Sequence, residues 1–404
     1  MTSSPIACFH YITRFSKADV AMENKKKILI QFFGEHITPY WNAFYREVDR
    51  HPEFELLVHN RIGIPGSHPW EFKDGMNYRY RNFVRPLFIP DVPSILSVLK
   101  ERNSLLFFIG AKGITKILLL ITAVLLNIRF VYFTDTLPDD HFKGVKGFFR
   151  RRFIFYMVFR YAEKVLSTGT AGVEQLITFG CPESKAVNFP YFIEIPSLKD
   201  VEKSQKKNGM FLDTYGAQDD VVLLASGRFI RRKGFDIIID ALHMYLKSSD
   251  NKQVKLFIAG DGPLSGELRK QVAELNLEKH VFFPGWVQPD QLDDFFGMGD
   301  VFIHMARYEP YGVVVLEAMA RKLPVIGSDM TMAVRDRIRH GENGFIIKTG
   351  DVNGLAGAIG YFAEQNGEMR KMGDAARKAV EEWPIEKGIK VIEEVGKNMK
   401  AYNG

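Results

Sequence analysis

Cysteine is rare in this chain, since Cys8 and Cys181 are the two cysteines among its 404 residues. A disulfide framework or a structural zinc site needs more cysteines than that, so the sequence excludes both. We expect the two thiols to be reduced and incidental to function, which fits a cytosolic protein.

Long hydrophobic runs are missing as well. The longest run, residues 117–126, lies between Lys116 and Arg129 and is too short to span a bilayer. A buried helix is expected there instead. The N-terminal stretch PIACFHYI follows no positively charged region, so no signal peptide is predicted. We expect a cytoplasmic protein, either free or peripheral on the inner face of the membrane, with residues 1–24 as an N-terminal extension.

The charge excess is small: 54 basic against 48 acidic residues give a net charge of +6. Because this excess is scattered and no groove-reading motif or zinc spacing accompanies it, nucleic-acid binding is not expected. The balance is compatible with anionic ligands or an anionic membrane surface. No feature of the sequence fixes an oligomeric state.

What the chain does contain is an alternation of short apolar runs with amphipathic stretches of helix length. This pattern indicates parallel sheets covered on both faces, and the length favours two domains. In the first half the predicted strands are 28–33, 54–59, 105–110, 129–134, 164–168 and 185–190, and the predicted helices are 40–51, 112–127, 147–162 and 170–179.

A second alternation follows the polar segment 199–219, which we predict to be an exposed linker or loop. Its predicted strands are 221–226, 255–260, 281–285, 301–305, 324–328 and 344–348. Ligands of doubly wound sheets bind beyond the carboxyl ends of the strands. The cleft between the two domains is therefore the predicted site.

The segment EPYGVVVLEAMARKLPVIGS, residues 309–328, is the most informative part of the chain. Glu309 and Glu317 lie eight positions apart, and 313–320 is predicted to be a buried helix that begins just after Gly312. The N–H groups and the dipole at such a helix start favour a diphosphate. The two carboxylates then suit sugar hydroxyls at two depths of one pocket. An amphipathic helix with two solvated glutamates is the alternative.

A second motif follows the first strand of the second half. Ser226-Gly227-Arg228 and Arg232-Lys233-Gly234 bracket a turn that projects Arg228 and Lys233 from the strand end. A guanidinium and an ammonium together suit a diphosphate, and their charge would stabilise a diphosphate leaving group. Taken alone, the motif could also be a basic surface loop.

These motifs, with the Gly260-Asp261-Gly262-Pro263 turn, resemble retaining glycosyltransferases of family 4, the glycosyl transferases group 1. The resemblance implies a GT-B fold, in which two Rossmann-like doubly wound domains face each other across a cleft. It implies a first domain over 25–198, joined by a C-terminal helix over 385–404, and a donor domain over 210–384.

The implied reaction is sugar transfer, with retention, from a UDP- or GDP-linked nucleotide sugar to a glycan or polyprenyl-linked acceptor. Bacterial cell-surface polysaccharide assembly is the implied setting, and no metal is expected. In the implied site, Glu309 contacts the donor sugar and Glu317 the ribose, while Trp286 and Val287 neighbour the base; Tyr311, Gly312 and Val313 also bind the donor. A sugar-nucleotide epimerase and an inactive scaffold subunit of an assembly complex are the alternatives.

The first domain matches the family less well. Gly34 stands where the family brings backbone to the diphosphate, but without a second glycine. Asp135 follows Thr134 where many relatives place His-Asp; it would orient the acceptor hydroxyl or accept its proton, or else cap a strand end. The second domain also departs from the family at 330–332, Met-Thr-Met, where relatives carry a glycine pair.

A basic and aromatic segment lies between the two motif regions. It comprises Lys143, Lys146 and 150–152, Arg-Arg-Arg, followed by FIFYMVFRY up to Tyr161. A buried helix with a solvated basic end is one interpretation. An interfacial helix that docks on anionic lipid and approaches a lipid-linked acceptor is the other.

Overall fold

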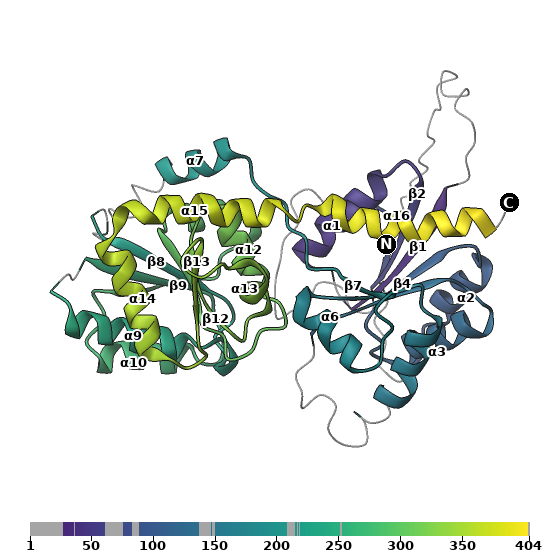
Figure 1. Cartoon of the computed structure of the whole chain (residues 1–404), viewed down its shortest axis with the longest axis horizontal. Helices are drawn as coiled ribbons and strands as arrows, with labels where there is room; N and C mark the ends of the chain where they lie inside the picture. Colours follow the sequence, from purple (N-terminus) through teal and green to yellow (C-terminus); the bar gives the residue numbers. More distant parts are fainter. Residues whose placement is uncertain are drawn as a thin grey trace, which may run out of the picture.

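The computed structural model describes residues 27–35, 37–60, 76–82, 89–136, 147, 150–207, 215, 217, 219–250 and 253–402. It contains two parallel sheets, each with helices on both faces (Figure 1). The predicted extension 1–24 and the residues Lys143 and Lys146 of the basic segment lie outside the described residues.

The first sheet has seven strands in the order β3-β2-β1-β4-β5-β6-β7. The strands are β1 (Ile28–Gly34), β2 (Phe54–Asn60), β3 (Tyr80–Asn82), β4 (Leu105–Ile109), β5 (Phe130–Thr134), β6 (Lys164–Ser167) and β7 (Ala186–Asn188). Because β1 pairs with both β2 and β4, the strand order reverses at β1, where a doubly wound sheet opens a crevice.

Helices cover both faces of this sheet. Helix α1 (Pro39–Arg50) and helix α16 (Ile385–Tyr402) share one hydrophobic core with it. The opposite core is formed with α2 (Val92–Lys100), α3 (Ile114–Leu125), the π-helix η2 (Arg150–Phe155), α5 (Tyr156–Tyr161) and α6 (Gly169–Thr178). Leu119, Leu120 and Ala123 of α3 are buried, so the longest apolar run is a buried helix, as predicted.

The second sheet has six strands in the order β10-β9-β8-β11-β12-β13. They are β8 (Val221–Ser226), β9 (Val254–Ala259), β10 (Val281–Gly285), β11 (Val301–His304), β12 (Val325–Ser328) and β13 (Gly344–Ile347). One face packs on α9 (Phe235–Ser248), α10 (Ser265–Glu274) and α14 (Val352–Glu364); the other packs on α11 (Leu292–Gly297), α12 (Val313–Ala320), α13 (Met332–Arg337) and α15 (Asn366–Glu381).

Every strand predicted from the sequence is present, within a few residues at each end. Two elements of the first domain were missed. Strand β3 is only three residues long and is largely polar, so it gives no alternation to detect. Helix α2 carries Pro93 in its first turn, where proline is tolerated, but its apolar run is short.

The linker prediction for 199–219 is wrong in its first half, because Leu198–Lys207 forms helix α7. Val201 and Ser204, three residues apart, are buried on one face, while Glu202 and Lys203 between them are exposed. Helix α7 packs on α11, and the Ser204 hydroxyl lies 3.4 Å from an Asp294 carboxylate oxygen. A single buried stripe therefore suffices to hold this highly charged helix.

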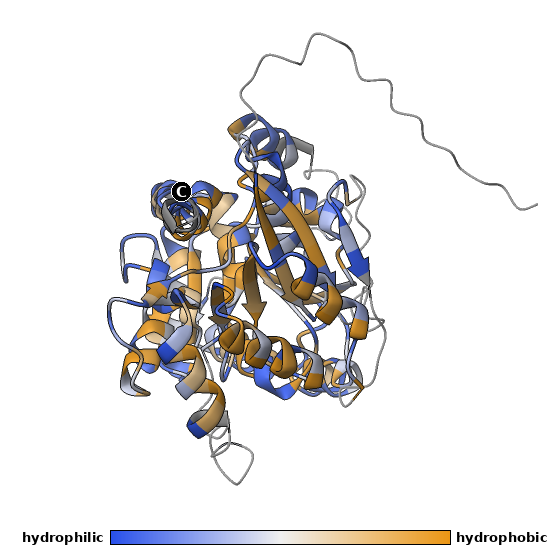
Figure 2. Cartoon of the chain, turned by 90° about the vertical axis from the view of Figure 1, so that its right-hand side faces the viewer, coloured by the Kyte–Doolittle hydropathy of each residue, from blue (hydrophilic) through white to orange (hydrophobic). Residues whose placement is uncertain are grey.

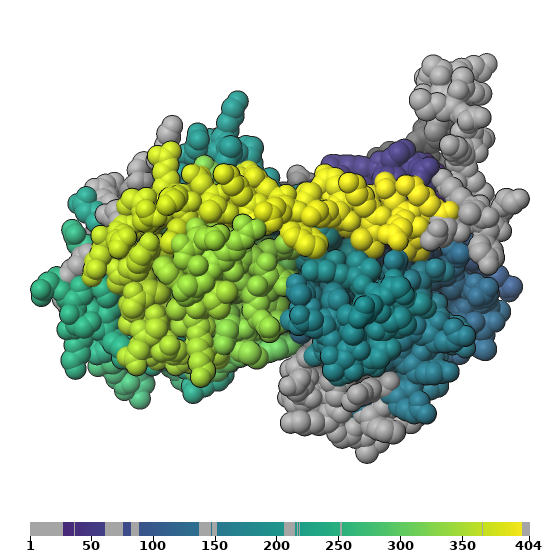
Figure 3. All heavy atoms as spheres, viewed as in Figure 1, coloured from purple at the N-terminus to yellow at the C-terminus, as the bar shows by residue number. Residues whose placement is uncertain are grey.

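The C-terminal helices connect the two halves of the molecule. Helix α15 lies on the second domain and α16 continues across onto the first, so that they form one band over both (Figures 1 and 3). Ile389, Ile392 and Val395 of α16 are buried in the first-domain core. A Cβ on Gly388 would lie 2.6 Å from the Phe192 ring, so only glycine fits this close crossing.

Hydropathy follows the same layering: the strands are strongly hydrophobic, and hydrophilic residues lie on the helices and loops around them (Figure 2). Among the described residues, no helix combines the length and the apolar character that a bilayer span requires.

Candidate functional site

A cavity of about 400 Å³ lies between the two domains. Pro39 and Tyr40, at the start of α1, form its first-domain wall. The loops after β8, β9 and β10 and the start of α12 form the other wall. Of the predicted site residues, the cavity is lined by Gly227, Arg228, Lys233, Trp286, Val287, Val313 and Glu317.

Gly34, Tyr311 and Asp135 do not line this cavity. Gly34 ends β1, where a Cβ would lie 3.2 Å from Asn60. The Tyr311 side chain is only 1% exposed, and the hydroxyl accepts a hydrogen bond from Arg337 at 3.3 Å. Asp135 directly follows β5 and accepts a hydrogen bond from the Tyr191 hydroxyl. The Tyr191 ring in turn packs against Tyr311 of the second domain.

The turn that carries Arg228 and Lys233 is fixed by glycine. Gly234 has φ 70°, and a Cβ there would lie 2.0 Å from the Met305 carbonyl oxygen, so the turn η3 (Arg231–Lys233) can approach β11 only with glycine at this position. Arg228 is exposed at the cavity, whereas Lys233 is largely buried, with 15% of its side chain exposed. The two cations therefore stand at different depths.

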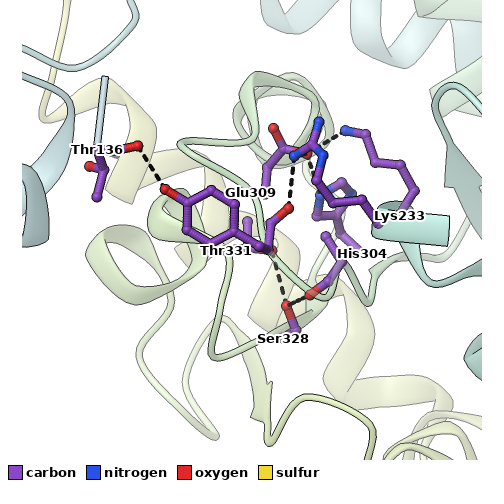
Figure 4. Close-up of polar contacts among 9 residues, drawn as sticks. Thr136, Lys233, His304, Glu309, Ser328 and Thr331 are labelled. Carbon is purple, nitrogen blue, oxygen red and sulfur yellow. Dashed lines mark hydrogen bonds and ion pairs between the residues drawn. The ribbon is translucent and has the colours of Figure 1, made fainter. Parts of the chain in front are cut away.

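Glu309 lies at the centre of a charge cluster behind the cavity (Figure 4). One carboxylate oxygen accepts hydrogen bonds from Lys233 at 2.5 Å and from Arg232 at 3.1 Å. Burial acts to raise the pKa of this carboxyl, but the charges of Lys233 and Arg232 outweigh it and hold the pKa below its ordinary value. Glu309 is therefore an anion with two cations beside it.

His304, the last residue of β11, supports the same cluster from beneath. Its side chain is 3% exposed, and its Nε2 lies 4.0 Å from the Glu309 carboxylate, beyond hydrogen-bond distance. Burial, together with the charges of Lys233 and Arg232, lowers the pKa of His304 to about 3, although Glu309 acts the other way. The imidazole is therefore neutral near pH 7.

The backbone around Glu309 is anchored by the Met-Thr-Met segment. The Glu309 N–H donates to the Met330 carbonyl at 2.9 Å, and the Glu309 carbonyl accepts from the Met332 N–H at 3.2 Å. A Cβ on Gly312 (φ 98°) would lie 2.8 Å from the Thr331 methyl group. Thr331 thus fills space at the start of α12, in the segment where relatives carry a glycine pair.

Glu317 lies inside α12 and borders the cavity at another point. Burial raises the pKa of its carboxyl, and Arg321 only partly opposes this. The Arg321 guanidinium is bound to Asp293 at 2.7 Å. The two glutamates therefore differ: Glu309 is held charged by neighbouring cations, whereas Glu317 lacks such a partner at close range among the described residues.

Two first-domain tyrosines, Tyr40 and Tyr191, connect the first domain to this site, and neither was assigned a role from the sequence. The Tyr191 hydroxyl donates to Asp135 at 2.6 Å, and its ring packs against Tyr40 and Tyr311, with centroid separations of 4.5 and 5.8 Å. Burial raises the pKa of the Tyr40 hydroxyl far above its usual range, so it remains a neutral group inside the cleft.

A direct hydrogen bond also crosses between the domains: the Tyr308 hydroxyl donates to the Thr136 carbonyl at 2.7 Å (Figure 4). Tyr308 immediately precedes Glu309, and Thr136 immediately follows Asp135. Arg232 and His304 were likewise not assigned from the sequence. Both could have been found from their positions in the sequence, because Arg232 lies within the Arg-Lys-Gly motif and His304 lies near the end of a predicted strand.

Residues 213–379 match the family model described as glycosyl transferases group 1. Over 162 residues, 40% of the chain, the protein is 31% identical to the lipopolysaccharide core biosynthesis glycosyltransferase LpsE of Rhizobium meliloti. Over 184 residues, 46% of the chain, it is 27% identical to the N-acetyl-alpha-D-glucosaminyl L-malate synthase of Bacillus anthracis. Each match spans 45% of the relative, so the similarity covers about half of these proteins.

Among solved structures, the chain resembles Anabaena Alr3699/HepE in complex with UDP, with a TM-score of 0.72 and 18% identity over 93% of this chain and 100% of that one. At this identity the likeness concerns the fold. Together with the two parallel doubly wound sheets, it confirms the GT-B architecture expected from the motifs.

Proposed function

We propose that the protein is a retaining glycosyltransferase, because residues 213–379 match the family model of the glycosyl transferases group 1 and the chain has the GT-B fold. It would move a sugar from a nucleotide-sugar donor to a glycan or lipid-linked acceptor. Bacterial cell-surface polysaccharide assembly is the proposed setting. The relative named for lipopolysaccharide core biosynthesis and the structural neighbour in complex with UDP support the class of acceptor and donor.

The observation that carries the proposal is the graded charge of the cleft. Arg228 is exposed at the cavity, Lys233 lies deeper, and Val313 at the start of α12 lines the same space. Two cations and the free N–H groups of a helix start form a site for a diphosphate. The nucleotide would then extend with its ribose on Glu317 and its base beside Trp286 and Val287.

Lys233 can serve Glu309 and a diphosphate together. An ammonium group has three N–H donors, and the described contacts use one of them, to Glu309. The remaining donors would bind phosphate oxygens as negative charge develops on the leaving group. Glu309 would thereby hold Lys233 in place and contact the donor sugar.

The proposed reaction is a same-face displacement. The bond between the anomeric carbon and the phosphate oxygen breaks, and its electron pair leaves with the nucleoside diphosphate. The acceptor hydroxyl oxygen forms the new bond on that face, and its proton passes to the leaving phosphate oxygen. Asp135 would orient the acceptor hydroxyl, since it lies at the first-domain side, where Tyr191 fixes one of its oxygens. Cation contacts to the leaving group would lower the barrier directly.

The test is release of nucleoside diphosphate from a panel of UDP- and GDP-sugars, with and without acceptor extracts, and with the anomeric configuration of the product read by NMR. Acceptor-dependent release with a retained configuration supports the proposal. Conversion of the donor sugar without release would identify an epimerase. Neither release nor conversion, with nucleotide still bound, would identify an inactive subunit.

A further inference from the structure

A second cavity, of about 560 Å³, lies on the first domain and is separate from the cleft. Its apolar walls are Phe155, Phe159 and Phe179, from η2, α5 and the end of α6. Arg152, Tyr156 and Arg160 also line it. The groove thus combines an aromatic floor with a cation from each of the two helices η2 and α5.

The surface beside this groove is unusually aromatic for an exposed helix. Phe153, Tyr156 and Tyr161 have exposed fractions of 43%, 58% and 50%. Arg152 and Arg160 are exposed on the same helices. Aromatic side chains that alternate with cations on one exposed face are typical of segments that rest in a membrane interface.

Among the described residues, no acidic side chain forms an ion pair with Arg152 or Arg160. The Lys185 ammonium donates to the Arg160 carbonyl at 3.1 Å, which adds a third cation at that end of the groove. Glu163, just beyond α5, is paired with Arg129 at 3.3 Å, and its charge also acts on Lys185. An anionic headgroup is therefore the complementary partner for the rim, and an acyl chain for the aromatic floor.

The groove lies on the outer surface of the first domain. In a parallel sheet, a segment that connects β5 to β6 runs back from the carboxyl edge to the amino edge. The start of η2 thus lies toward the edge that faces the second domain, and α5 extends away from it. Arg160 at the end of α5 and Phe179 after α6 both precede strand starts, so most of the groove lies toward the amino edge, away from the cleft.

We infer that the groove between Arg152 and Arg160 is a docking site for an anionic lipid of a bilayer surface, with the lipid phosphate on the arginines and a chain against the phenylalanines. The predicted basic cluster contributes Arg152 here; Lys143 and Lys146 and the side chains of residues 150–151 lie outside the described part of the chain. The link to a lipid-linked acceptor rests on the proposed function, whereas lipid docking itself does not.

Vesicle flotation with the full chain tests the inference. Phosphatidylcholine vesicles, with and without phosphatidylglycerol, are compared at low and high salt. Wild type should bind the anionic vesicles and lose most of that binding at high salt. One arginine at an anionic surface corresponds to roughly a fivefold change in partitioning, so Arg152→Gln with Arg160→Gln should bind roughly 25-fold less.

The matched control is Lys247→Gln with Lys270→Gln, which removes two exposed cations from α9 and α10 of the other domain. It should bind like wild type. A second variant, Phe153→Ser with Tyr156→Ser, should lose the binding that survives salt. Wild-type binding that does not depend on phosphatidylglycerol, or a double-arginine variant that binds like wild type, would overturn the docking site.

Donor hydrolysis in solution separates this inference from the proposed function. The double-arginine variant should release nucleoside diphosphate from a soluble donor at the wild-type rate, because these residues do not line the cleft cavity. Intact release with lost vesicle binding supports the groove. Absent release in wild type both with and without acceptor extracts, together with normal vesicle binding, would reject the proposed function and leave the groove standing.

Discussion

The two domains place their polar side chains in opposite ways. In the second domain, Lys233, Glu309 and Glu317 gather at the cleft edge, and the core beneath is apolar. In the first domain, a polar network is sealed away from the cleft. His59 lies 3.1 Å from both Gln31 and Ser94, and the Ser94 hydroxyl donates to Asp91 at 2.6 Å.

This difference indicates that the polar groups of the second domain are available for the reaction, whereas the polar network of the first domain stabilises the fold. Polar groups that satisfy one another inside a core hold β1, β2 and α2 in register and offer nothing to a ligand. Polar groups at a sheet edge remain available. The second domain is therefore expected to carry most of the reaction, and the first domain to contribute through the residues that meet the cleft, Tyr40, Tyr191 and Asp135.

Lys233→Ala and Arg228→Ala test the donor side and should have the largest effect. Removing one charge contact to a leaving group typically raises the barrier by about 2.7–4 kcal/mol, so kcat should fall about a hundredfold to a thousandfold in each. Arg231→Ala is the control, because Arg231 is 75% exposed and pairs with Asp236 at 3.6 Å. Near wild-type turnover in either main variant contradicts the leaving-group assignment.

Asp135→Asn tests the acceptor side. A misplaced acceptor hydroxyl should lower acceptor-dependent turnover by about a hundredfold, while nucleotide affinity stays constant. Tyr191→Phe removes the hydrogen bond to Asp135 but keeps the carboxylate, so a smaller loss is expected. If Asp135→Asn weakens nucleotide binding as strongly as turnover, the division between donor and acceptor domains fails at this residue.

Glu317→Gln and Glu309→Gln test whether the two glutamates of the donor domain have different roles, one in nucleotide binding and one in turnover. Hydrogen bonds to charged groups are worth about 1.5–3 kcal/mol, so Glu317→Gln should weaken nucleoside diphosphate binding by about tenfold to a hundredfold. Glu309→Gln should mainly lower turnover with the intact donor, since it alters the anchor of Lys233. Calorimetry with nucleoside diphosphate decides: unchanged affinity in the first variant refutes the ribose role.

His59 should make the stability of the first-domain network depend on pH. Burial lowers the pKa of folded His59 to about 4, helped by Arg81 and opposed by Asp91. The unfolded chain takes up that proton near pH 6.5, so stability is lost as the pH falls from about 6.5 to 4, by roughly 3 kcal/mol. In urea unfolding, His59→Gln should flatten this pH dependence, and His243→Gln on α9 should not. Equal slopes in all three proteins would contradict a buried neutral imidazole.

Chelation should have no effect on activity, because the cations of the second domain take the place of a metal in the proposed reaction. In the described part of the chain, no three His, Cys, Asp or Glu side chains gather where they could hold a metal ion. Asp293 of the Asp293-Asp294 pair binds Arg321 at 2.7 Å, and Asp139 and Asp140 lie outside the described residues. Activity lost in EDTA and restored by magnesium or manganese would refute this prediction.

The sequence by itself determined every described strand except β3, the helix after Gly312 and the cation turn between Gly227 and Gly234. These features depend on local information. A buried parallel strand favours an uninterrupted apolar run, and a backbone with positive φ favours glycine, so each leaves a mark in a few consecutive residues. The π-helix η2, within the basic segment, could not be recognised from its sequence.

The tertiary structure alone decided which partners these residues have. Lys233 and Glu309 are 76 positions apart, and Tyr308 meets Thr136 across 172. Two buried residues anchor helix α7, although most of its residues are charged. His59 is neutral because its neighbours exclude water. Such contacts depend on distance through space and on local dielectric, and neither is written in the order of residues along the chain.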